Sequence, residues 1–108
     1  MEIRKLLFFR DGARLVRLDI ERLVYIEADK VYCHLHMKDG GRITLSHPMS
    51  DLVPYLPEEI FVRINRSYII NIGSVLSICG RIVQLFDGTE LRIGNTYCDI
   101  LNNYIAVM

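Results

Sequence analysis

Short apolar segments separated by polar turns run along most of the chain. The segments are rich in Val, Ile, Tyr and Phe, which favour extended strands, and dipeptides such as Asp11-Gly12 and Asp87-Gly88 mark turns between them. Residues 31–37 alternate apolar and polar side chains, as a strand with one buried face does. We predict about nine or ten short strands, over residues 5–10, 13–20, 23–28, 31–37, 42–45, 61–64, 68–72, 75–79, 81–86 and 90–93.

Two segments have helical spacing instead. A short mid-chain helix is predicted after Ser46-His47-Pro48, although Pro54 opposes a regular helix, so it is either kinked or begins nearer Asp51. A C-terminal helix is predicted after Gly94-Asn95-Thr96, where the residues that share one helical face are Tyr97, Ile100, Leu101, Tyr104 and Ile105. The chain is therefore expected to be one mainly β domain, residues 1–108.

Composition narrows the class of protein. The chain is 51% hydrophobic and 24% charged, which indicates a globular core. Its 13 basic and 13 acidic residues cancel, so it is no polycation that would bind nucleic acid indiscriminately. No apolar run is long enough for a membrane span or a signal peptide. Three scattered cysteines indicate buried thiols in a reducing compartment, and we expect a cytoplasmic protein.

Charge is unevenly distributed around one polar corner. No acidic residue occurs from Ile60 to Phe86, and within this stretch Asn65, Arg66 and Ser67 interrupt two apolar strands. A guanidinium at Arg66 can pair with two acceptors of guanine, and an amide at Asn65 can pair with adenine. The alternatives are a surface salt bridge for Arg66 and a turn-capping role for Asn65. Arg63 can brace the corner or touch a DNA phosphate.

Residues 61–71, Phe-Val-Arg-Ile-Asn-Arg-Ser-Tyr-Ile-Ile-Asn, resemble the signature of the LytTR DNA-binding family, a bacterial transcription-factor domain. That signature runs F-x-R-x-x-R-S, an aromatic, two aliphatics and N, and the family usually has His where Asn65 stands. Further segments resemble the family in the same order, namely 23–28, the helix with its Leu56-Pro57 exit, and 87–91. The resemblance covers roughly residues 5–105.

The resemblance implies an elongated stack of small antiparallel sheets that reads double-stranded DNA through loops at one edge. The residues that match its DNA-contacting positions are Lys30, Tyr32, Arg63, Asn65, Arg66 and Asn95. Lys30 suits a phosphate, and Tyr32 a sugar, phosphate or base edge. Gly94-Asn95 departs from the family's common Ser-Arg and removes one basic contact. The backbone amides at this helix start can still hold a phosphate, and the alternative is that Asn95 or Thr96 caps the helix. The resemblance leaves open whether one copy or a homodimer occupies the DNA.

Family members usually carry a phosphorylatable receiver domain before this domain. A chain of 108 residues has no room for one, so we expect either a stand-alone regulator or a fragment of a longer one. The alternative function is a protein-interaction module, the same fold with a degenerate DNA-reading edge, which the neutral net charge favours.

Other classes of site are less favoured by the sequence. No nucleophile elbow, phosphate-binding glycine loop or H-E-x-x-H motif occurs, so we expect no enzyme and no cofactor. His34 and His36 form an H-x-H pair that could hold a metal with further ligands, and nothing places His47 nearby. We expect two solvated histidines on an outer strand face and no metal site.

Overall fold

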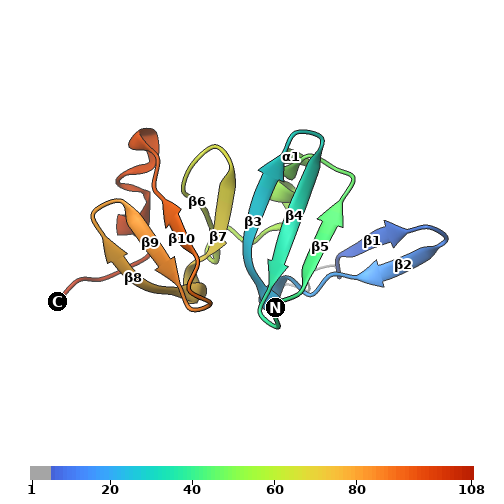
Figure 1. The fold of residues 1–108 in the computed structure, drawn as a ribbon, viewed down its shortest axis with the longest axis horizontal. Helices are drawn as coiled ribbons and strands as arrows, with labels where there is room; N and C mark the ends of the chain where they lie inside the picture. Colours follow the sequence, from blue (N-terminus) through green and yellow to red (C-terminus); the bar gives the residue numbers. More distant parts are fainter. Residues whose placement is uncertain (1–5) are drawn as a thin grey trace.

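A computed structural model describes residues 6–108 and contains ten strands in three antiparallel sheets (Figure 1). The strands are β1 Phe8–Asp11, β2 Arg14–Arg17, β3 Leu23–Asp29, β4 Tyr32–Met37, β5 Arg42–Leu45, β6 Phe61–Arg63, β7 Tyr68–Asn71, β8 Val75–Cys79, β9 Ile82–Leu85 and β10 Glu90–Arg92. The sheets are the hairpin β1–β2, a central sheet ordered β5-β4-β3-β7-β6, and a three-stranded sheet ordered β10-β9-β8. The predicted mainly β fold is confirmed, and residue 5 of the first predicted strand lies outside the described residues.

The mid-chain helix is short, because Pro54 removes a backbone donor after one turn. Helix α1, Met49–Leu52, passes directly into a 3-10 turn, η2, Val53–Tyr55. Two further 3-10 turns, η1 Ile20–Arg22 and η3 Ile72–Ser74, join strands of the stack.

The C-terminal segment is helical, as predicted, but not as one helix. It forms two 3-10 turns, η4 Asn95–Tyr97 and η5 Ile100–Asn103. Leu101 is buried, whereas Ile105 lies beyond the last turn and is 38% exposed. Asn, Asp and Thr side chains compete for backbone hydrogen bonds, and residues 95–103 are rich in them, which explains why a longer α-helix does not form.

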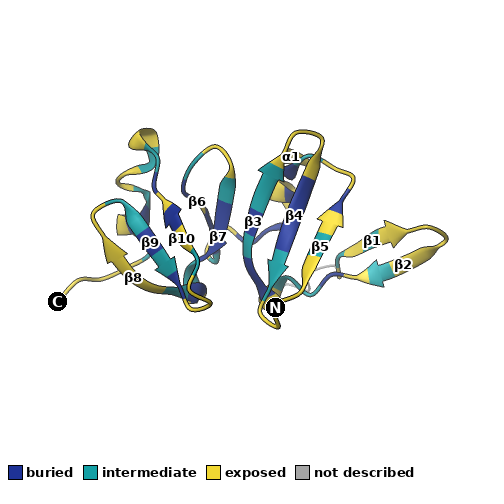
Figure 2. Ribbon diagram, viewed as in Figure 1, coloured by how far each residue is buried: buried dark blue, intermediate teal, exposed yellow. Residues whose placement is uncertain are grey.

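The layers are stacked along the longest dimension of a molecule measuring 48 × 36 × 26 Å. In Figure 2 the buried positions lie on strands of the central sheet and on the strands that face it. One core joins the central sheet to α1, through residues such as Ile26, Leu35 and Leu52. A second core joins the same sheet to the three-stranded sheet and to η5, through Ile70, Val83 and Leu101 among others.

Strand β3 supplies both cores. Its register to β4 shifts between Leu23 and Tyr25, so Leu23 and Ile26 pack in the same core although they are three residues apart, while Val24 packs in the other core. A bulge of this kind reorients side chains on one strand without breaking the sheet. The central sheet is thereby covered on both faces, which fixes its strand ends and the loops between them.

The expectation of two solvated histidines is wrong for His34. Its side chain is buried, at 8% exposure, between Asp29 and Thr44, each 2.8 Å from a ring nitrogen. His36 is half-buried and stacks on Tyr25, with ring centroids 4.1 Å apart. The alternating pattern identified the strand face correctly, but it could not show that cross-strand partners would cover it.

Candidate nucleic-acid interface

Three loops from separate parts of the chain meet at one edge of the stack, which we call the loop edge: residues 29–32, 64–67 and 93–97. They lie on the upper side of the view in Figure 1, where β3 ends, where β6 turns into β7 and where β10 ends. Backbone hydrogen bonds join them, from Ala28 to the carbonyl of Ser67 at 2.7 Å and from Gly94 to that of Ile64 at 2.8 Å. The loops therefore form one connected surface.

Asn65 holds the middle loop in shape. Its Oδ1 accepts hydrogen bonds from the backbone amides of Ser67 and Tyr68 at 2.8 and 2.9 Å. Its Nδ2 donates to the carbonyl of Arg92 at 2.7 Å, which joins this loop to the end of β10. With these three bonds inside the protein, the geometry favours the capping role that the sequence left as an alternative to adenine recognition.

The two arginines of the corner differ in what they contact. Arg63 donates from Nε to the carbonyl of Asn65 at 3.1 Å and from Nη2 to that of Arg66 at 2.5 Å, so it braces the corner. The Arg66 side chain is exposed and has no hydrogen bond or ion pair within residues 6–108. The predicted alternative of a surface salt bridge for Arg66 is thus absent from the described part of the chain.

The first loop is a tight turn between β3 and β4. Asp29 pairs with Tyr32 across it, and Lys30 adopts a φ of 56°, a left-handed conformation that side chains other than glycine disfavour. Lys30 is exposed, and Tyr32 is 45% exposed. A lysine and an aromatic side chain are thereby available to an external ligand.

The third loop packs closely against the second. A Cβ added at Gly94 would lie 3.2 Å from Cδ2 of Tyr97 and 3.4 Å from Cβ of Asn65, so the missing side chain allows the close approach. Asn95 is exposed, and η4 has no side-chain cap. Between the two loops lies an open hollow of about 610 Å³, lined by residues 65–68 and 94–97.

Each of the two carboxylates beside the loop edge lies within hydrogen-bonding distance of a histidine. Asp29 pairs with His34, and Glu27 lies 3.2 Å from Nε2 of His36 and accepts a 3.4 Å hydrogen bond from the Tyr68 hydroxyl. Burial, followed by the charge of Glu27, raises the pKa of Tyr68 above its ordinary 10.0, so this hydroxyl stays a neutral donor. The exposed cations Lys30, Arg66 and Arg92 have no acidic partner within the described residues.

Every residue predicted to contact DNA lies on the loop edge or braces it. The hollow is also lined by Thr96 and Tyr97, and the Arg92 carbonyl anchors Asn65; none of these three residues was predicted to contact DNA. Tyr97 was assigned to a helix face, and no local pattern in the sequence relates it to Asn65. The edge offers unpaired cations, an amide and aromatic rings, which are the groups that bind phosphates and bases.

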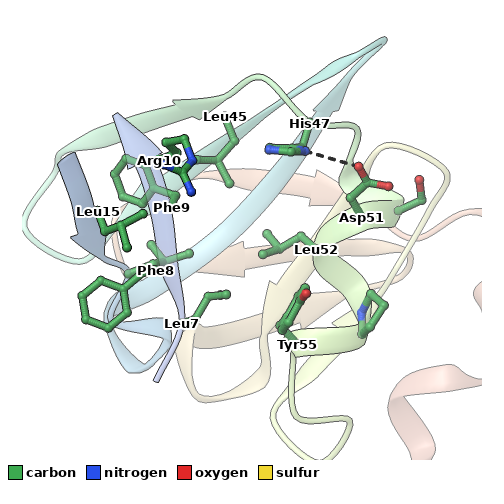
Figure 3. Close-up of a pocket in the computed structure, with 13 residues that line it drawn as sticks. Leu7, Phe8, Phe9, Arg10, Leu15, Leu45, His47, Asp51, Leu52 and Tyr55 are labelled. Carbon is green, nitrogen blue, oxygen red and sulfur yellow. Dashed lines mark hydrogen bonds and ion pairs between the residues drawn. The ribbon is translucent and has the colours of Figure 1, made fainter. Parts of the chain in front are cut away.

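A second hollow, of about 590 Å³, lies away from the loop edge, between the β1–β2 hairpin and the α1–η2 segment (Figure 3). Its walls are mainly apolar, with Phe8, Leu15 and Tyr55 well exposed, and Nδ1 of His47 lies 3.4 Å from Oδ2 of Asp51. None of the predicted site residues lines it. Within residues 6–108, no cluster of three or more potential metal ligands and no helix able to span a membrane occurs.

The fold and the edge together define a class of domain: a stack of small sheets that presents cationic loops on one side. The LytTr DNA-binding domain family matches residues 13–106, so the chain belongs to that family. The solved LytTr DNA-binding domain of a Bacillus cereus protein described as a response regulator has the same fold, with a TM-score of 0.77 and 14% identity, over 96% of this chain and 99% of that one. No protein with a curated description matches the sequence significantly.

Proposed function

We propose that this domain binds double-stranded DNA in a sequence-specific manner and acts in bacterial transcription regulation, in the cytoplasm. Membership of a DNA-binding family supports DNA as the partner. The observation that carries the proposal is the unpaired guanidinium of Arg66, exposed on a corner whose backbone is fixed by Asn65 and Arg63. Because the backbone of this corner is already fixed, binding costs little backbone conformational entropy.

The mechanism divides between contacts that position the protein and contacts that read bases. Lys30 and Arg92 would neutralise phosphates and set the register of the loop edge on the duplex. Arg66 would read guanine through O6 and N7, and Tyr32 and Asn95 would contact the sugar, phosphate or base edges beside it. Arg63 and Asn65 would act from behind, by holding the corner.

Selection of bound sequences from a random DNA pool tests this proposal. We expect one preferred site, and we expect Arg66→Ala to weaken binding to it by about 1–3 kcal/mol and to relax the preference at one base pair. Arg17→Ala is the matched control, because Arg17 is also exposed and unpaired in the described residues but lies on the β1–β2 hairpin. An enriched pool without any consensus would contradict sequence-specific binding.

The same selection addresses the number of copies on DNA. A homodimer would recover two half-sites related by symmetry and separated by about 10 bp or a multiple of that turn. A single copy would recover one undivided site. Either result is compatible with Arg66 reading a base.

A further inference from the structure

A chain of hydrogen bonds leads from β5 through a buried histidine to the first loop of the loop edge. Nδ1 of His34 lies 2.8 Å from Oγ1 of Thr44, and Nε2 lies 2.8 Å from Oδ2 of Asp29. Both ring nitrogens are therefore engaged, and the ring is 8% exposed. A buried ring held at both nitrogens has one orientation, so it offers Asp29 a fixed partner.

The turn that follows Asp29 needs such support. Lys30 has a φ of 56°, a conformation that costs a residue with a Cβ about 1 kcal/mol or more and persists where surrounding contacts impose it. Two contacts fix the chain just before Lys30: the Asp29 side chain on His34, and the Ala28 amide on the carbonyl of Ser67. The second contact also joins this turn to the corner that carries Arg66.

If only its charge mattered, Asp29 would weaken DNA binding at this position. A carboxylate next to Lys30 would repel the DNA phosphates that Lys30 attracts. A geometric role explains its presence, because the carboxylate accepts a hydrogen bond from His34 and so orients the turn.

We propose that His34 is a positioning residue for DNA binding: it acts through Asp29 to hold the turn that aims Lys30 and Tyr32. This inference rests on the proposed function of the loop edge. It predicts that Asp29 and His34 matter for DNA affinity although neither is expected to touch DNA.

The first test compares two aspartates of similar exposure, one beside the buried His34 and one beside the exposed His47. The Asp29 side chain is 55% exposed and the Asp51 side chain 56%, and each pairs with one histidine, but Asp51 lies on α1 at the second hollow. We expect Asp29→Ala to raise the Kd for the selected DNA about fivefold, which corresponds to about 1 kcal/mol. Asp51→Ala should leave the Kd within about twofold.

The direction in which the Kd changes distinguishes a geometric role of Asp29 from an electrostatic one. Removing a negative charge beside phosphates should tighten binding if only electrostatics acts, so tighter binding by Asp29→Ala would overturn the inference. Asp29→Asn should restore near-normal affinity, because its Oδ1 can still accept from His34. His34→Gln should weaken binding as Asp29→Ala does, and the double variant should be no weaker than either single variant.

A measurement without DNA keeps the two proposals distinguishable. In Asp29→Ala we expect faster hydrogen exchange of the Ala28 amide and greater backbone motion at Lys30 and Val31 by NMR. If the turn is as rigid as in the parent, the inference fails even where the parent binds its DNA site. If the parent selects no DNA sequence, the proposed function fails and the positioning role fails with it.

Discussion

Asn65 and Arg66 are neighbours in the sequence, yet their side chains have different surroundings. The exposure of Arg66 was predictable, because a polar corner between two apolar strands projects from the fold. The role of Asn65 was left as one of two alternatives, since the Arg92 carbonyl that it bonds lies 27 residues away. Side-chain chemistry shows what a residue can bind, whereas its partner depends on tertiary structure.

Asn65→Ala should destabilise the fold by about 1–3 kcal/mol, because it leaves two backbone amides and one carbonyl without their partner. Urea unfolding of the variant measures this. Asn103→Ala is the control, since Asn103 is exposed and its side chain has no hydrogen bond within the described residues. Equal stability of the two variants would show that Asn65 does not hold the corner.

The three cysteines should differ in reactivity. Cys33 is fully buried, and burial, followed by the charge of Asp51, raises the pKa of its thiol above the ordinary 9.0. Cys79 and Cys98 are exposed. A thiol reagent at neutral pH should therefore modify Cys79 and Cys98 in the folded protein and Cys33 after unfolding.

The raised pKa of Cys33 also has a consequence for stability. The folded state holds this proton more tightly than the unfolded chain, so the contribution is fully present below pH 9.0 and is lost as the pH rises through the folded pKa. We expect Cys33→Ser to reduce the alkaline loss of stability. Urea unfolding at pH 8 and above pH 9 would check this, and an unchanged pH profile would contradict it.

At the scale of elements, the strands were more predictable than the helices. Predicted strands 42–45 and 75–79 have the observed bounds, because apolar runs and turn residues are local signals. The C-terminal segment has helical spacing but forms two 3-10 turns, since its short polar side chains oppose a longer helix. The buried face of this segment was nevertheless predicted correctly at Leu101, which lies in the core.

Leu101→Ala should destabilise the protein by about 2–5 kcal/mol, because Leu101 is 3% exposed and belongs to the core beneath the three-stranded sheet. Val107→Ala is the control, with Val107 87% exposed. A loss below about 0.5 kcal/mol for Leu101→Ala would mean that η5 does not close this core. Chemical unfolding monitored by circular dichroism gives both values.

At the scale of the whole molecule, the order of the sheets could not be deduced from periodicity. The pairing of β3 with β7 joins strands about forty residues apart, such as Ile26 with Ile69, and no local pattern encodes it. The family resemblance predicted the stack, and through it the gathering of three loops at one edge. The hydrogen bonds from Asn65 to the Arg92 carbonyl and from Gly94 to the Ile64 carbonyl became visible only with the three-dimensional structure.

A net charge of zero is compatible with the proposed partner, because the local distribution of charge and not its sum attracts a phosphate backbone. Lys30 and Arg92, the two unpaired cations assigned to phosphates, should release about two counterions, so the logarithm of the DNA binding constant should fall with log salt at a slope of about −2. Lys30→Ala should weaken binding to all sequences alike and reduce the slope by about one unit, whereas Arg17→Ala should leave it unchanged. Equilibrium DNA titrations from low to moderate salt measure both the binding constant and its salt slope. If DNA binding is weak and shows no such dependence, the loop edge does not bind a phosphate backbone, and the protein-interaction alternative becomes the better explanation of its exposed surface.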